Sequence, residues 1–269
     1  MPVARLPLRG AFEAIDWDAP WLVPYRAHGQ AACAAVLGGA GVAQALNAVP
    51  ARAQVRLAAG ALRFVPQSEL PPGEAYESFI FRTACVPTRD HLHDFFNGLV
   101  WLAEPALKLR LNELHAQVLA VEGVQPRRSP LRDALTLLDE SGALLDAPAD
   151  AVALLRARRW RELLVAQRGR WLSGEIRLRL IGHAVMEQLV QPYKGITAHV
   201  WPAGAVRALD AGVQVLQPRP FLPLPVLGVP PWWAANAQPG FYEDEAVFRP
   251  LPSPASADSV RLRPASLAR

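Results

Sequence analysis

One short segment, PTRDHLHDFFNGLVW at residues 87–101, constrains the fold most, because it sets an Arg, two His, two Asp and an Asn within one apolar helix. His93, Asn97 and Trp101 follow one another at intervals of four residues, so they share one face of that helix. Leaving such groups unpaired in a protein interior costs roughly 1–3 kcal/mol each. The segment therefore predicts either a functional site or a hydrogen-bonded network on a half-buried face.

The sequence as a whole predicts a helix-rich α+β fold. Hydrophobic residues make up 51% of the 269 residues, which is enough for a sizeable core, and we expect a single globular domain over residues 1–250. Apolar periodicity and the positions of the prolines predict a helix or helix pair at 31–48 and helices at 75–85, 89–103, 105–120, 149–158, 160–172 and 178–190. Two further segments, 55–66 and 196–201, are typical of strands.

Three features describe the second half of the chain. Residues 135–146, LTLLDESGALLD, predict a short β-hairpin with Gly142 in its turn. From Pro218 to Pro231 the prolines stand too close together for a helix, which predicts an extended Pro/Trp-rich C-terminal arm that wraps the core. Residues 251–269 are rich in Ser, Pro, Ala and Arg and predict a disordered tail.

Composition and charge narrow the function classes. The net charge is only +4 and nearly all basic residues are arginine, so we interpret the excess as coding bias and do not expect a nucleic-acid partner. The two cysteines, Cys33 and Cys85, indicate a reducing compartment. The charge-free stretch 30–50 is too rich in Gly, Gln and Asn for a membrane span, and residues 1–10 lack the apolar region of a signal peptide. We therefore expect a cytoplasmic protein without membrane association.

Histidines and carboxylates in several segments are candidates for a divalent-metal site. His183 and Glu187 lie four residues apart on a predicted helix and share one face, as in metal sites and oriented general bases. A metal held by such groups can activate water, so the first hypothesis is a metal-dependent hydrolase. Its metal ligands would be His93, Asp94, His183 and His199, with Glu187 as a catalytic residue or the alternative carboxylate.

Two basic residues complete this hypothesis. Lys194 is one of only two lysines and stands beside Gly195, where a backbone can approach closely. Arg89 belongs to the segment at 87–101. Both would neutralise the charge of a small anionic substrate. The sequence has no nucleotide-binding glycine pattern, so we expect no nucleotide cofactor.

A non-catalytic interpretation fits the same residues. The polar groups would then form a buried hydrogen-bond network that includes Asn97, Asp139 and Glu140. The Pro/Trp-rich arm or exposed aromatic side chains would bind a protein partner. The enzyme and the scaffolding or protein-binding module stay open as alternatives, because both depend on which of these side chains converge in space.

Several segments resemble a known family. The motifs IDWxxPWL, PTRDHLHDFFNGLVW, LTLLDESG, GHAVMEQL, PYKGITAH and LPVLGVPPWW are similar to the successive motifs of the bacterial domain-of-unknown-function family 3025. The resemblance spans residues 12–250, so it supports the domain assignment. It implies no activity, and no catalytic residue can be carried over from it.

Overall fold

The helices follow the apolar stretches of the sequence. The computed structural model describes residues 8–123, 127–238 and 240–251. Two segments between the α-helices matter below: the 3-10 helix η1 (Pro20–Tyr25) and the π-helical segment η4 (Arg161–Ala166). The α-helices are α1 (Leu8–Glu13), α2 (Arg26–Leu37), α3 (Val42–Asn47), α4 (Tyr76–Thr83), α5 (Leu92–Ala103), α6 (Pro105–Glu122), α7 (Pro130–Ser141), α8 (Ala149–Arg156), α9 (Arg168–Leu172) and α10 (His183–Gln188).

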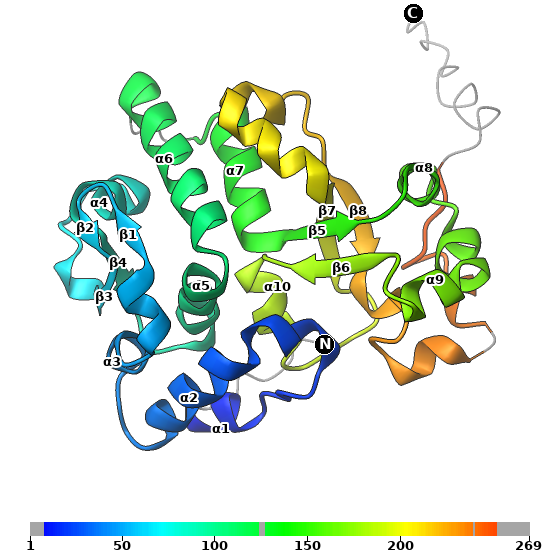
Figure 1. Cartoon of the computed structure of the whole chain (residues 1–269), viewed down its shortest axis with the longest axis horizontal. Coiled ribbons are helices and arrows are strands. Elements are labelled where there is room, and N and C mark those ends of the chain that lie inside the picture. Colours follow the sequence, from blue (N-terminus) through cyan, green and yellow to red (C-terminus); the bar gives the residue numbers. More distant parts are fainter. Residues whose placement is uncertain (1–7, 124–126, 239, 252–269) are drawn as a thin grey trace, which may run out of the picture.

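Small sheets flank the long helices. An antiparallel pair joins β1 (Arg56–Leu57) to β2 (Gly60–Ala61), and a parallel pair joins β3 (Arg63–Pro66) to β4 (Cys85–Thr88). The largest sheet has the order β6-β5-β7-β8, in which only β5 and β7 are parallel. Figure 1 shows this sheet on one side of α5, α6 and α7 and the smaller pairs on the other, which confirms the helix-rich α+β class. The strands of the largest sheet are β5 (Gly142–Asp146), β6 (Arg177–Leu180), β7 (Thr197–Pro202) and β8 (Leu222–Pro225).

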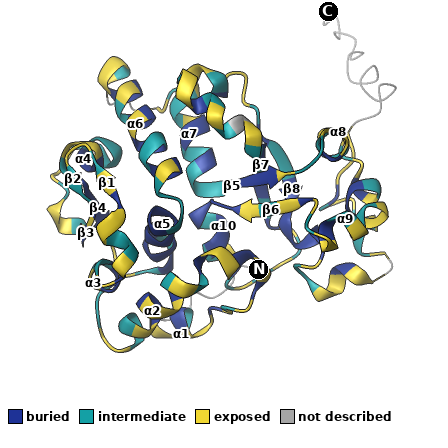
Figure 2. Cartoon of the chain, in the orientation of Figure 1, coloured by how far each residue is buried: buried dark blue, intermediate teal, exposed yellow. Residues whose placement is uncertain are grey.

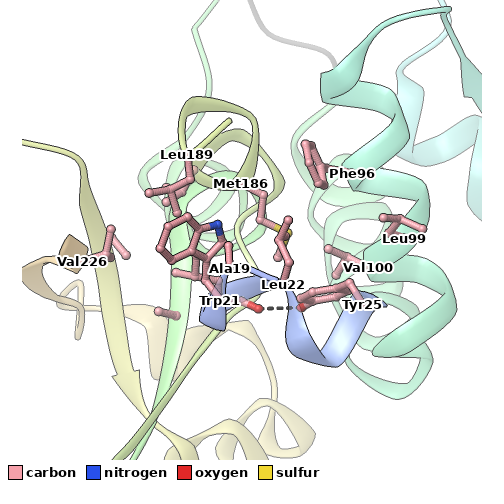
Figure 3. Packing of buried hydrophobic residues seen from close by; sticks show 14 of the residues in the cluster. Ala19, Trp21, Leu22, Tyr25, Phe96, Leu99, Val100, Met186, Leu189 and Val226 are labelled. Atoms are coloured by element: carbon pink, nitrogen blue, oxygen red, sulfur yellow. Dashed lines mark hydrogen bonds between the residues drawn. The ribbon is translucent and has the colours of Figure 1, made fainter. Parts of the chain in front are cut away.

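Helix α5 lies at the centre because nearly its whole surface is apolar. Ten of its twelve residues are buried, and Figure 2 shows the helix almost entirely in the colour of buried residues. Asp94 and Asn97 are the polar members of the buried set. Figure 3 shows η1 packed between α5 and α10, with Leu22 beside Met186. This packing fixes α10 next to α5 and thereby determines which polar side chains of the two helices meet.

The β-hairpin predicted at 135–146 is wrong. Helix α7 runs directly into strand β5, with no turn between two strands. Ser129 caps the start of this helix, and Leu135 and Leu138 are buried three residues apart, which is the helical period. Gly142 has a φ of −76° and is therefore no left-handed turn residue. It is required for a close approach, because a Cβ there would lie 2.1 Å from the carbonyl oxygen of Leu138.

The helix predicted at 178–190 begins later than expected, at His183. The residues before it form strand β6, in which Arg177 and Arg179 are exposed and Leu180 is buried. This alternation has a period of two and belongs to a strand with one face on the core. The correction places His183 at the first position of α10, immediately after the sheet ends.

The other elements agree more closely with expectation. The extended arm is confirmed: β8 adds to the edge of the sheet, and the residues after it are buried. Of the tail predicted at 251–269, residues 252–269 lie outside the described residues. Among the described helices, none is long and apolar enough to cross a membrane. The segment at 31–48 forms the pair α2 and α3, 55–66 contains β1, β2 and β3, 160–172 divides into η4 and α9, and 196–201 falls within β7.

Candidate functional site

A cavity of about 470 Å³ opens among α4, α5, α6, α7 and the first turn of α10. This volume is in the range of small-molecule sites. Much of the wall consists of charged and hydrogen-bonding side chains, and some of them are deeply buried. The lining residues are Gln67, Leu70, Ala75, Tyr76, Glu77, Arg89, His93, Asp94, Asn97, His115, Leu119, Arg128, Arg132, Thr136, Asp139, Glu140 and His183.

Two histidines meet directly at the wall of this cavity. The Nε2 atom of His93, on α5, lies 3.1 Å from the Nε2 atom of His183, on α10. The Nδ1 atom of His93 lies 3.1 Å from Oε2 of Glu187, which is four residues after His183 on α10. His183 and Glu187 therefore lie on one face of α10, as their i, i+4 spacing predicts. His93 packs against that face and contacts both side chains.

The environments of the two imidazoles differ. The hydrogen bond to Glu187 raises the pKa of His93 above 6.5, and it lowers the pKa of Glu187 in return. Burial lowers the pKa of His183 to about 4. His183 is only 4% exposed, whereas the side chain of His93 retains 30% exposure. The hydrogen bond to Glu187 therefore favours the protonated form of His93, whereas burial favours the neutral form of His183.

This assignment accounts for the protons of the pair. Only one of the two facing Nε2 atoms can carry a hydrogen, and a charged His93 donates it to His183 while its Nδ1–H donates to Glu187. His183 then carries its own proton on Nδ1, which lies 3.8 Å from Oδ2 of Asp139. That Nδ1 makes no hydrogen bond within the described part of the chain. Each imidazole thus has a carboxylate near its Nδ1 atom, Glu187 for His93 and Asp139 for His183, and the two rings face each other through their Nε2 atoms.

A second polar network lies deeper, around a buried lysine. Lys108 Nζ donates to Oδ1 of Asp139 at 2.6 Å and to Oδ1 of Asn97 at 2.8 Å. Asn97 in turn donates to the hydroxyl of Tyr76 at 3.0 Å. Burial opposes the ionisation of Asp139, but the charge and hydrogen bond of Lys108 outweigh it and lower the pKa of that carboxyl. The ammonium also lies 5.3 Å from the ring centroid of Trp101.

Arg89 and Asp94 neutralise one another. The guanidinium contacts both carboxylate oxygens of Asp94 at 3.0 Å, and the backbone N–H of Arg89 donates to Oδ2 at 2.7 Å. Burial of Asp94 is outweighed by these bonds, which lower the pKa of its carboxyl. Arg89 was expected to bind substrate and Asp94 to bind metal, but each already has a partner in the other.

Lys194 and His199 lie away from the cavity wall. Lys194 donates to Asp244 at 3.0 Å and lies 4.5 Å from the ring centroid of Phe241, so it attaches the C-terminal arm. His199 stands on β7 between its neighbours β5 and β8, and burial lowers its pKa. Glu140 lines the cavity, as do Asp139 and Asn97.

The structure therefore brings together only part of the predicted set. His93, His183 and Glu187 converge, and Asp139 and Asn97 support them from the lysine network. Across residues 8–123, 127–238 and 240–251, no group of three or more His, Cys, Asp or Glu side chains is arranged to hold a metal ion.

Sequence reasoning missed Lys108, Tyr76 and the basic residues on α7. The signal for Lys108 was present, since it is one of two lysines in an arginine-rich chain. The neighbouring glycine makes the sequence favour Lys194 over Lys108 as the functional lysine. Rarity alone did not distinguish the lysine of a buried network from the lysine that attaches the arm.

The comparisons with known proteins identify a family and no activity. A family model with the description "Protein of unknown function (DUF3025)" matches residues 62–207 and 202–251. The matched residues include both members of the histidine pair and Glu187. No curated protein and no solved structure matches this chain.

Proposed function

The chain belongs to the DUF3025 family of proteins of unknown function, and we propose from the chemistry of its site that it is a hydrolase that acts on a small anionic substrate by acid–base catalysis. The observation that carries this proposal is the Glu187–His93–His183 chain at the cavity wall. Two titratable groups whose environments drive their pKa values apart provide an acid and a base at the same pH. His93 is the acid of this pair, and His183 is the base.

The contact between the rings supports a complete proton cycle. Entry of water and substrate between the rings replaces the hydrogen bond from His93 to His183 Nε2 with one from water. His183 Nε2 then removes a proton from this water, and the water oxygen bonds to the electrophilic carbon or phosphorus of the substrate. The bond to the leaving group breaks as His93 Nε2 gives its proton to the departing oxygen or nitrogen. His183 then returns its proton to His93 across the 3.1 Å separation, which restores the starting state. Glu187 stabilises the charge of His93 and fixes the orientation of its ring.

A divalent metal is a second form of the same proposal. His93 and His183 would hold such an ion through their Nε2 atoms, and Glu187 and Asp139 would orient the two rings. The ion would act as a Lewis acid that activates water.

The network interpretation applies to the deeper residues. Lys108, Asp139 and Asn97 are buried and bonded to one another, which is the pattern of a structural network. We assign that network to stability and the outer histidine pair to chemistry. The low cysteine content and the family resemblance support a bacterial, cytoplasmic setting for the enzyme.

Hydrolysis of a substrate panel tests the proposal. The panel contains phosphate esters, carboxylic esters and amides that carry an anionic group, and the protein is purified without metal and assayed with and without Zn²⁺. We expect His93→Gln to lower the rate on any cleaved member by about 10²–10⁴-fold, because it removes the acid. His28→Gln on α2 is the matched control and should leave the rate unchanged.

Three outcomes separate the forms of the proposal. Cleavage by the metal-free protein supports the proton cycle, and cleavage that appears only with Zn²⁺ supports the metal form. Equal rates for the wild-type protein and His93→Gln, or no cleavage of any panel member, contradict the hydrolase assignment.

A further inference from the structure

The cavity extends away from the histidine pair along two neighbouring helices. The bond between Lys108, near the start of α6, and Asp139, near the end of α7, requires the two helices to run antiparallel, as they do in Figure 1. His115 lies seven residues after Lys108, and Arg132 lies seven residues before Asp139. At 1.5 Å per residue both are about 10 Å from the lysine network, so they reach the same level at the far end of the cavity.

The far end carries buried polar atoms without partners. His115 is only 5% exposed, and its Nδ1 makes no hydrogen bond to the described residues. The Nε of Arg132 is also buried and without a partner within that part of the chain. Leaving such a group unpaired costs about 1–3 kcal/mol, and unpaired buried atoms in a native structure call for a bound water, ion or ligand.

The arginine side chains at the far end of the cavity carry positive charge that is not neutralised by an ion pair within the described part of the chain. Arg128 and Arg132 both line the cavity, and neither forms an ion pair with another described residue. Of the carboxylates at the cavity, Asp139 is paired with Lys108, and Glu140 stands beside Asp139 at the near end. Glu77 accepts from the neutral amide of Asn112 at 2.7 Å and keeps its charge, so two guanidinium groups outweigh one carboxylate at the far end. A guanidinium presents a fork of donors that fits the oxygens of phosphate or carboxylate.

We propose that the far end of the cavity is an anion subsite, in which Arg132, Arg128 and His115 bind a phosphate or carboxylate group of the substrate. This inference rests on the proposed function and specifies its substrate class: a molecule whose anionic group reaches the level about 10 Å beyond the lysine network, while its reacting bond lies at the histidine pair. The subsite takes the role that sequence reasoning gave to Arg89 and Lys194, whose charges are neutralised by Asp94 and Asp244.

Calorimetric titration with inorganic phosphate and, separately, with acetate tests the subsite and distinguishes the two anions. We expect Arg132→Gln to weaken binding of the preferred anion at least about tenfold, because a charge-assisted hydrogen bond is lost. Arg132→Lys keeps the charge without the fork and should fall between the two proteins. Arg127→Gln is the matched control, since Arg127 is exposed, close in sequence and not part of the cavity wall.

The outcomes separate this inference from the proposed function. The subsite is overturned if the wild-type protein binds neither anion. It is also overturned if Arg132→Gln, with an unchanged melting temperature, binds the anion as tightly as the wild-type protein does. Hydrolysis that depends on His93 but not on Arg132 supports the hydrolase and contradicts the subsite. Anion binding that depends on Arg132, with no hydrolysis of any panel member, supports the subsite and contradicts the hydrolase.

Discussion

Replacing Lys108 with methionine is expected to lower the free energy of unfolding by about 3–5 kcal/mol. The side chains of Lys108 and Asp139 are only 6% and 15% exposed, so the substitution leaves a carboxylate inside the protein without its cation. Asn97 also loses the donor to its Oδ1. Urea unfolding at pH 7, followed by circular dichroism, measures the change.

Two further variants test the origin of this effect. The double variant Lys108→Met/Asp139→Leu should be more stable than Lys108→Met alone, because it removes the unpaired charge. Arg177→Met breaks an ion pair whose side chains are 70% and 62% exposed, and it should cost less than about 1 kcal/mol. A cost for Lys108→Met as small as that for Arg177→Met would contradict a structural role for the lysine network.

Stability is expected to fall by about 3 kcal/mol between pH 6.5 and pH 4 through His183 alone. In this window the unfolded chain binds a proton at His183 with a pKa of 6.5, while the folded protein, in which burial lowers that pKa to about 4, does not. The unfolded state therefore holds more protons, so stability rises with pH and is lost as the pH falls. Each pKa unit corresponds to about 1.4 kcal/mol, which sets the size of the effect.

His93 acts in the opposite direction at higher pH. Its pKa is raised by the bond to Glu187, so the folded protein holds the extra proton above pH 6.5, and this stabilisation is lost as the pH rises through the folded pKa. The pair thus predicts a stability maximum near pH 6.5.

Unfolding measured across this pH range for the wild-type protein, His183→Gln and His28→Gln isolates the contribution of the pair. The difference between the wild-type protein and His183→Gln should shrink as the pH falls to 4, whereas His28→Gln should follow the wild-type curve. A difference that does not depend on pH would show that His183 is not held neutral by burial.

The sequence predicted the elements better than their junctions. The apolar periods of α5 and α6 and the prolines that bound them placed both helices nearly correctly. The hairpin at 135–146 failed because an acidic, glycine-containing segment has the same composition at the end of a helix as in a turn. Gly142 serves a close approach to Leu138, and such a need depends on tertiary contacts that local patterns do not reveal.

The site was predictable only where its members share a helix. The i, i+4 spacing placed His183 and Glu187 on one face of α10. Their encounter with His93 depends on the packing of α5 against α10, which no spacing encodes. His199 was grouped with them because of its residue type, yet strand register places it inside the sheet.

An NMR titration of the histidine ring signals tests the central claim most directly, namely that His93 and His183 differ as acid and base. The account predicts a pKa above 6.5 for His93, a fall of that pKa in Glu187→Gln, and a pKa of about 4 for His183. A His93 pKa at or below 6.5 that does not respond to Glu187→Gln, or a His183 that titrates near 6.5, would contradict it.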